Sequence, residues 1–248
     1  MPQRHVVVTG GGRGIGAATA RRFKEIGDRV TIMARSRVEI ERLADEIGAY
    51  SVRTDVSDPA SVEAAFMAAG PVDILVNNAG IVRTSLLMKT DVRVWDEHLK
   101  VNLTGAFLCS LKVLPGMMSR GRGSIINVSS VAGVQGIPFL GAYTASKHGL
   151  IGLTRALAAE VGDAGVAVNA VCPYFTDTPM LGSAAVAIAE KSNRTGEDVL
   201  ASFKARHPEN RLLDPMEVAD AIVYLASDAA QGVSGQALMV ERGTLTFT

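Results

Sequence analysis

The sequence has few cysteines, no excess charge of either sign and no long apolar run. Only two cysteines, Cys109 and Cys172, occur in 248 residues, far apart and without a second Cys or His at metal-ligand spacing. Neither a disulfide framework nor a metal site is therefore predicted. Twenty-five basic residues balance twenty-five acidic ones, so nothing favours nucleic acid or an anionic membrane as a partner. We expect the partner to be a small molecule.

The first residues show no targeting pattern. Met1 to His5 lead directly into an apolar segment, without the charged and then apolar stretch of a signal peptide. No apolar run approaches the ~18 residues that a membrane span needs. Together with the scarcity of cysteine, these features predict a cytoplasmic protein in a reducing compartment.

Short apolar runs alternate with helical patterns along the chain. The runs do not alternate with polar residues, as expected for strands that are buried on both faces of a parallel sheet. They begin at Val6, Val30, Ile74, Ser124, Val166 and Ala237. Helical patterns occupy residues 15–26, 38–47, 61–69, 92–118, 143–161 and 216–225. This alternation predicts a doubly wound α/β sheet flanked by helices.

Local signals agree with these boundaries, and one segment interrupts them. Pro59 and Pro215 suit first helical turns, and Ser36 and Asp91 suit N-caps. Residues 178–213 form a connection too long for a simple loop, with helical stretches inside it, and we interpret them as a lid over a site. The chain shows no linker or repeat, so residues 1–248 are expected to form one dinucleotide-binding catalytic domain.

A glycine-rich segment, residues 9–16, follows the first predicted strand and opens a helix. Glycines there allow a tight turn and let backbone N–H groups approach a pyrophosphate, which the helix dipole favours. No Gly-Lys-Ser/Thr ending is present, which argues against a triphosphate-binding loop. A dinucleotide is therefore predicted. Two registers fit, one using Gly12, Gly14 and Ala17 and the other Gly10, Gly14 and Gly16.

The end of the second predicted strand bears on the choice of cofactor. An NAD-binding fold usually places a carboxylate there for the ribose 2′-hydroxyl, but this chain has Ala34, Arg35 and Ser36. Arg35, with Arg13 and Arg37, can instead hold a 2′-phosphate through charge-assisted hydrogen bonds. We predict that NADP(H) is preferred and that NAD(H) is the second choice. The alternative is that these arginines only extend along the surface.

Tyr143 and Lys147 lie four residues apart in a helical pattern and so share one helix face. A nearby cation favours the phenolate and lowers the pKa of a tyrosine from its usual ~10. Such a pair can transfer a proton at neutral pH. The alternative interpretation of this pair, taken alone, is a solvated helix face.

Four further motifs occur in order: Asp55-Val56, Asn77-Asn-Ala-Gly80, Asn102 and Ser129-Ser130. With the glycine loop and the Tyr143 and Lys147 pair, the chain resembles the short-chain dehydrogenase/reductase family over essentially its whole length, and it is similar to NADP(H)-type 3-ketoacyl thioester reductases. The resemblance implies a Rossmann-type seven-stranded parallel sheet in the order 3-2-1-4-5-6-7. It also implies the Gly10, Gly14 and Gly16 register and a homotetramer or dimer.

The resemblance also implies roles for individual residues. Tyr143 is expected to be the general acid/base, Lys147 to lower its pKa and hold the nicotinamide ribose, Ser130 to bind the substrate carbonyl and Asn102 to anchor a proton relay. These roles suit hydride transfer to a ketone, in which the developing alkoxide needs a hydrogen-bond donor and a proton. The expected cofactor contacts are Gly10, Arg13, Gly14, Ile15, Gly16, Arg35, Asp55, Val56, Asn78, Ala79, Gly80, Tyr143, Lys147, Pro173, Thr176 and Thr178.

The chain departs from the family pattern after the sixth predicted strand. Tyr174 occupies a usual glycine position and Thr176 replaces a branched aliphatic residue, while Arg242 stands at another glycine position near the end. Tyr174 is either a substrate contact or an aromatic plug packed under the lid.

The function predicted first is an NADPH-dependent carbonyl reductase acting on a 3-ketoacyl thioester. The lid carries Lys191, Arg194, Lys204 and Arg206, which can give a phosphate-bearing carrier a basic resting place or can belong to an ordinary solvated helix pair. One alternative is a dehydrogenase that oxidises a secondary, cyclic or steroid-like alcohol. A remote alternative is a dinucleotide-binding regulator without turnover.

Overall fold

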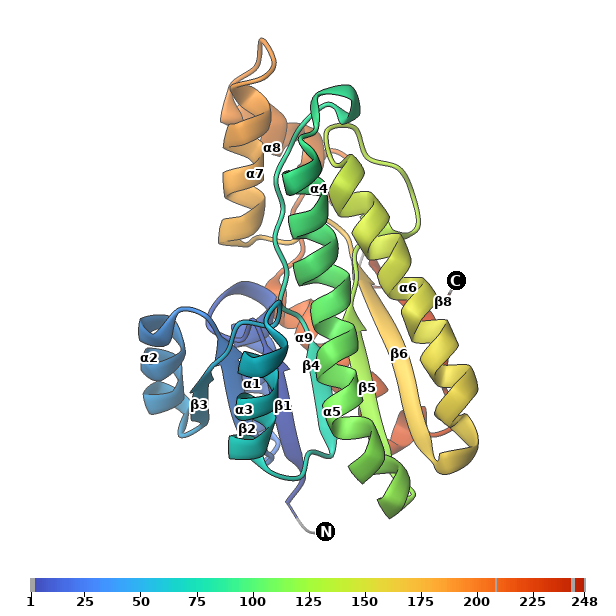
Figure 1. Cartoon of the computed structure of the whole chain (residues 1–248). Coiled ribbons are helices and arrows are strands. Elements are labelled where there is room, and N and C mark those ends of the chain that lie inside the picture. Colours follow the sequence, from blue (N-terminus) through green and yellow to red (C-terminus); the bar gives the residue numbers. More distant parts are fainter. Residues whose placement is uncertain (1–2, 208, 242–243, 248) are drawn as a thin grey trace.

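The computed structural model describes residues 3–207, 209–241 and 244–247. Within them one sheet of eight strands has the order β3-β2-β1-β4-β5-β6-β7-β8 (Figure 1). The strands are β1 (His5–Thr9), β2 (Arg29–Ala34), β3 (Tyr50–Arg53), β4 (Ile74–Asn77), β5 (Gly123–Val128), β6 (Val166–Pro173), β7 (Ala237–Glu241) and β8 (Thr244–Phe247). The first seven pair in parallel, as predicted.

The eighth strand, β8, was not predicted, and it pairs antiparallel with β7 at the edge of the sheet. Its short sequence alternates polar and apolar residues, whereas continuous apolar runs predict six of the other strands. The remaining strand, β3, is half-exposed and was expected only from the family resemblance. An antiparallel edge strand needs burial on one face at most, so it carries a weaker sequence signal.

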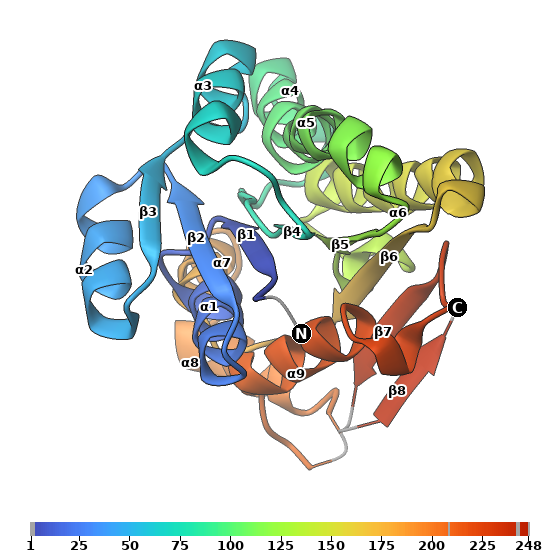
Figure 2. The same ribbon diagram turned by 90° about the horizontal axis from the view of Figure 1, so that it is seen from below.

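Helices cover both faces of the sheet (Figure 2). One face carries α1 (Gly14–Glu25), α2 (Arg37–Ile47) and α9 (Pro215–Leu225), and the other carries α3 (Pro59–Ala69), α5 (Gly105–Arg120) and α6 (Gly141–Val161). The first face buries Phe23, Ile32 and Ile222, and the second buries Met117 and Ile125. Burial on both faces explains why the central strands β1, β4 and β5 are mainly apolar.

The helix starts follow the predicted local chemistry. Pro59 and Pro215 lie in the first turns of α3 and α9. The side chains of Ser36 and Asp91 accept backbone hydrogen bonds at the starts of α2 and α4 (Val92–Leu99). These caps satisfy donors that have no partner within the helix.

The helix predicted over residues 92–118 has an irregular middle. After α4 the chain makes a π-helical turn, Lys100–Thr104, before α5 begins. The N–H of Gly105 bonds the carbonyl of Lys100, five residues back, instead of the usual four. Asn102 lies within this turn.

The continuous helical segment Val92–Arg120 is long and apolar enough to cross a membrane by length and composition alone. Half of its apolar window is buried inside the protein. A core helix of a water-soluble fold has the same properties, so this segment is weak support for a membrane span.

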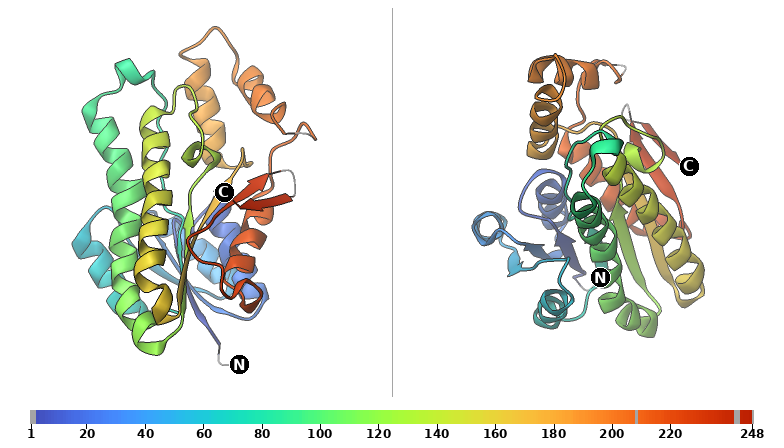
Figure 3. Two further views of the ribbon diagram at one scale, coloured as in Figure 1. Left: turned by 90° about the vertical axis from the view of Figure 1, so that its right-hand side faces the viewer. Right: turned by 45° about the horizontal axis from the view of Figure 1, so that its top comes forward.

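The predicted lid consists of two helices, α7 (Pro179–Ala189) and α8 (Gly196–Lys204), that stand above the carboxyl ends of the strands (Figure 3). The two helices share a small apolar core with Phe175, which includes Ile188, Val199 and Phe203. The lid therefore packs on the segment that follows β6.

Candidate active site

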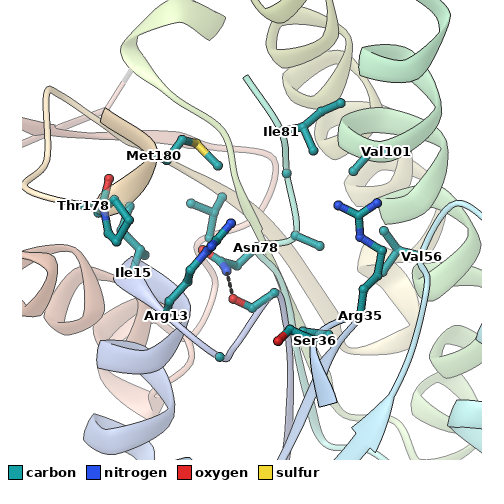
Figure 4. A pocket seen from close by; sticks show the side chains of 18 of the residues that line it. Arg13, Ile15, Arg35, Ser36, Val56, Asn78, Ile81, Val101, Thr178 and Met180 are labelled. Atoms are coloured by element: carbon teal, nitrogen blue, oxygen red, sulfur yellow. Dashed lines mark hydrogen bonds between the residues drawn. The ribbon is translucent and has the colours of Figure 1, made fainter. Parts of the chain in front are cut away.

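A cavity of about 420 Å³ lies at the carboxyl ends of β1, β2 and β4 (Figure 4). In doubly wound sheets this edge is where ligands bind. Most of the predicted cofactor contacts line it: Gly10, Arg13, Gly14, Ile15, Arg35, Asp55, Val56, Asn78, Ala79, Gly80, Tyr143, Lys147 and Thr178. The structure thus brings together residues that are up to 168 positions apart in the sequence, from Gly10 to Thr178.

The glycine loop has the geometry of a phosphate cradle. Gly10 and Gly14 have φ values of +64° and +54°, which favour glycine. A Cβ added to Gly16 would lie 2.4 Å from the carbonyl oxygen of Gly10, so glycine is needed for the close packing of α1 against the loop. Gly16, which was predicted as a cofactor contact, does not line the cavity. Asn78 fixes the loop by donating from Nδ2 to the carbonyls of Thr9 and Gly10, each at 3.0 Å.

Among the residues that the structure describes, no side chain caps the start of α1. Its first-turn N–H groups therefore remain available at the cavity, where the helix dipole favours an anion. The cradle fits the pyrophosphate of a dinucleotide, in the register of Gly10, Gly14 and Gly16.

The far end of the cavity combines two arginines with two carboxylates. Asp55 accepts hydrogen bonds from the backbone N–H and the hydroxyl of Ser57, at 2.9 and 2.7 Å. Burial acts to raise the pKa of Asp55, but the Ser57 hydrogen bonds and the charge of Arg35 outweigh it, and the net pKa is lowered. Arg13 pairs with Glu39 at 3.4 Å, whereas Arg35 makes no hydrogen bond or ion pair within the described part of the chain.

The predicted catalytic residues meet at the other end. Tyr143 and Lys147 come from α6, and the Lys147 Nζ lies 5.6 Å from the centre of the Tyr143 ring. Lys147 is only 4% exposed, and its Nζ donates to the carbonyl of Val128 at 2.7 Å. Ser130 lies two residues after the end of β5 and lines a second cavity together with Tyr143.

Asn102 reaches this cluster from the π-helical turn. Its Oδ1 accepts from the N–H of Ile81 at 2.8 Å, and its Nδ2 donates to the carbonyl of Ile81 and to the hydroxyl of Ser146, each at 3.0 Å. Asn102 therefore fixes the segment after β4 against α6. That segment includes Gly80, where an added Cβ would lie 3.3 Å from the Asn102 Oδ1.

The pKa of Tyr143 differs from the sequence-based expectation. Burial raises the pKa of Tyr143 to about 12, and the neighbouring Ser130 hydroxyl only partly opposes this shift. Burial also lowers the pKa of Lys147 to about 8. The expected lowering of the Tyr143 pKa is thus not found in this structure, because burial of the phenol outweighs the hydrogen bond with Ser130. At neutral pH the phenol keeps its proton and is poised to donate it.

Sequence reasoning did not find the contribution of His98. This buried side chain bonds the carbonyl of Val94 through Nδ1 at 2.7 Å, and its Nε2 accepts the N–H of Arg83 at 3.0 Å. Its ring meets the Tyr143 ring edge-on, with centroids 6.5 Å apart. One signal was available, since His98 precedes Asn102 by four residues and such residues share a helix face.

The second cavity, of about 110 Å³, lies under the lid and shares Tyr143 with the first. Among the described residues its lining includes no charged side chain. Pro173 and Thr176, predicted as cofactor contacts, line this cavity instead of the larger one. The reason is the path after β6, where Thr176 bridges to Leu213 and its hydroxyl bonds the carbonyl of Tyr174 at 2.9 Å.

Tyr174 both lines this cavity and packs under the lid. Its ring meets Phe175 edge-on at 5.0 Å, and its N–H donates to the carbonyl of Val240. Tyr174 does not have a positive φ, so the position does not require the glycine usual in the family. Arg242, the other departure, lies outside the described residues.

Most of the lid cations are already engaged within the protein. Lys191 donates to the carbonyl and the hydroxyl of Thr84, and Arg194 donates to the carbonyl of Asp198. Arg206 lies over the Phe175 ring at 5.9 Å. The expectation that these three groups offer a free basic surface to a phosphate-bearing carrier is therefore not supported. Lys204 is exposed.

The fold and the site together define an oxidoreductase that binds a nicotinamide dinucleotide. Residues 10–244 match the family model described as enoyl-(acyl carrier protein) reductase. The chain is 40% identical over 250 residues to cis-4-hydroxycyclohexanecarboxylate dehydrogenase of Sinomonas cyclohexanicum, covering 97% of this chain and 96% of the relative. It is 38% identical to the 3-oxoacyl-acyl-carrier-protein reductase FabG of Vibrio cholerae, covering 96% and 95% of the two chains.

A solved structure of an actinorhodin polyketide ketoreductase variant with NADPH is similar at a TM-score of 0.91 and 36% identity, covering 97% of each chain. The protein belongs to the short-chain dehydrogenase/reductase family, whose members act on alcohol and ketone groups.

Proposed function

We propose that the protein is an NADPH-dependent carbonyl reductase that transfers hydride to the ketone of a 3-ketoacyl thioester, with Tyr143 as the general acid. The observation that carries this proposal is the position of Tyr143 between the two cavities, because it lines both. The larger cavity suits the dinucleotide and the smaller suits the substituent of a ketone. A bound nicotinamide cofactor supplies the hydride.

The neighbouring residues complete the proton transfer. The hydroxyls of Ser130 and Tyr143 hold the carbonyl oxygen, and Tyr143 releases its proton as alkoxide charge develops. The Lys147 ammonium lies over the Tyr143 ring and would hold the nicotinamide ribose. Asn102 keeps the segment after β4 in place and anchors the relay that returns a proton to the site.

Preference for NADP(H) over NAD(H) is supported at the end of β2. Arg35 lines the larger cavity, is exposed and makes no hydrogen bond or ion pair within the described part of the chain. A 2′-phosphate can therefore bind it without displacing another group. A similar structure contains NADPH, which agrees with this assignment.

A second candidate is the oxidation of a cyclic alcohol. The small cavity is lined by uncharged side chains, and four of the five lysines and arginines of the lid contact other groups of the protein, namely Lys191, Arg194, Arg206 and Arg211. Both features suit a compact apolar ring as well as an acyl chain. The similarity to a relative named cis-4-hydroxycyclohexanecarboxylate dehydrogenase supports this second candidate.

Initial rates with matched substrates test these proposals. We would compare acetoacetyl-CoA, the acetoacetyl thioester of N-acetylcysteamine and 4-methylcyclohexanone, each with NADPH and NADH. Because most of the lid cations are engaged, the two thioesters should have kcat/KM values within about threefold of each other. Fast turnover of the cyclic ketone alone would replace the thioester by the second candidate. No turnover of any ketone or alcohol would reject the enzyme proposal.

The assembly and compartment proposed for this protein follow the family resemblance. We propose one catalytic domain, a cytoplasmic location and a homotetramer or dimer formed through α5 and α6. Phe107 and Leu111 on α5 are 39% and 44% exposed, which supports an apolar contact. Light scattering that gives a monomer at micromolar concentration would reject the assembly.

A further inference from the structure

The phosphate-binding end of the larger cavity contains an ion pair for which the proposed reaction has no use. The Nη1 of Arg13 lies 3.4 Å from the Oε1 of Glu39, and both residues line the cavity. Arg13 belongs to the glycine loop and Glu39 to the first turn of α2. Figure 4 shows Arg13 and Arg35 rising from different elements with Ser36 near the base of Arg35.

We propose that Glu39 competes with the 2′-phosphate of the cofactor for Arg13, and so determines how strongly the protein prefers NADP(H) over NAD(H). This inference rests on the proposed function in one respect, since it takes the larger cavity as the dinucleotide site. The inference assigns opposite effects to two charged residues that line this cavity. Arg35 attracts the phosphate, and Glu39 weakens its binding.

The Glu39 side chain packs against the glycine loop that carries Arg13. A Cβ added to Gly12 would lie 3.0 Å from the Glu39 Cβ, so the glycine loop lies directly against this side chain. The Arg13 side chain is 66% exposed and the Glu39 side chain 36% exposed. The arginine is thus the freer partner. To bind a phosphate it must give up a contact that Arg35 does not have.

The charges at this end also balance before any ligand binds. Arg13 and Arg35 face the carboxylates of Glu39 and Asp55, and the pKa of Asp55 is lowered, which keeps it ionised at neutral pH. A phosphate dianion therefore meets lining side chains without net positive charge, although Lys100, outside the lining, also acts on Asp55. Removing the Glu39 charge leaves one positive charge in excess, while the Asp55 carboxylate stays bonded to Ser57.

Calorimetric titration with two nucleotides tests the inference without turnover. The probes are 2′,5′-ADP and 5′-AMP, which differ only in the phosphate at the 2′ position. We expect Glu39→Gln to tighten 2′,5′-ADP about fivefold at low ionic strength and to change 5′-AMP by less than about twofold. The matched control is Glu41→Gln on the same helix, which removes the same charge from a residue that pairs with Arg37 at 2.7 Å. Neither Glu41 nor Arg37 lines the cavity. This control should leave the ratio of the two affinities unchanged.

An Arg13→Gln background separates competition from simple repulsion. If Glu39 acts by holding Arg13, the gain from Glu39→Gln should disappear in Arg13→Gln protein. A gain that persists there, or an affinity ratio that Glu39→Gln does not change, would overturn the inference. The proposed cofactor preference fails on a different result, namely wild-type protein that binds 5′-AMP at least as tightly as 2′,5′-ADP.

Discussion

Lys147 is expected to cost the protein stability, and Lys147→Met tests this. Burial lowers the pKa of Lys147 from the ordinary 10.5 to about 8, and its side chain is almost fully buried. A shift of this size corresponds to about 3 kcal/mol of destabilisation while the amine is charged in both states. The lost hydrogen bond to Val128 offsets about 1 kcal/mol. We therefore expect Lys147→Met to raise the free energy of unfolding at pH 7 by about 2 kcal/mol.

The pH dependence of this stability difference shows whether the buried amine is its cause. Below the folded pKa of about 8 both states bind the proton, and the wild-type protein bears the whole penalty. Between about 8 and 10.5 the native amine loses its proton while the unfolded one keeps it, so wild-type stability rises with pH. The advantage of Lys147→Met should accordingly shrink by about 2 kcal/mol between pH 7 and pH 9.5. Tyr143, with a pKa raised to about 12, does not interfere in this range.

Urea denaturation at pH 7 and pH 9.5, at equal protein concentration and without cofactor, measures both quantities. Lys204→Met is the control, because it removes an exposed lysine of the lid and should show the same difference from wild type at both pH values. A Lys147→Met protein that is less stable than wild type at pH 7, or whose advantage does not change with pH, would refute the argument from burial. Turnover should be lost in either case.

Three further substitutions test separate parts of the site. Tyr143→Phe keeps the ring but removes the proton, so turnover should fall at least about 100-fold while the NADPH dissociation constant, from fluorescence titration, stays within about twofold; retained turnover would exclude this general acid. His98→Leu leaves the N–H of Arg83 without its acceptor and should lower the free energy of unfolding in urea by about 1–3 kcal/mol, so an unchanged midpoint would show that this bond is dispensable. Lys191→Met releases the lid from Thr84, and steady-state kinetics should show a higher KM for the ketone without a lower kcat; an unchanged KM would mean that the contact does not hold the lid closed.

The sequence predicts the sheet well because its strands are buried on both faces. A continuous apolar run such as the one that begins at Val6 is typical of a central parallel strand in a chain that alternates strands with helices. The π-helical turn at Lys100–Thr104 could not be predicted in this way, since one extra residue in a helix leaves the overall apolar pattern almost unchanged. The antiparallel β8 was missed because an edge strand needs little burial.

The candidate site was likewise predicted only in part. Gly10, Asn102, Tyr143 and Lys147 were predicted because their motifs have fixed spacing. Contacts between distant surface charges have no such spacing, and Lys191 meets a residue 107 positions away. The raised pKa of Tyr143 could also not be predicted from the sequence, because it depends on how deeply the phenol is buried.

The π-helical turn makes the length of one helix matter to the site. Because Gly105 bonds back by five residues, the α5 side chains are rotated relative to α4 by about one residue's worth of helical turn compared with a regular helix. Deleting a single residue there would restore regular geometry, and the chain would then have to misplace either Asn102 or the buried face that includes Cys109 and Met117. Insertions and deletions that this fold accepts in its surface loops should therefore be rejected in these five residues, so that selection acts on their number as well as on their identity.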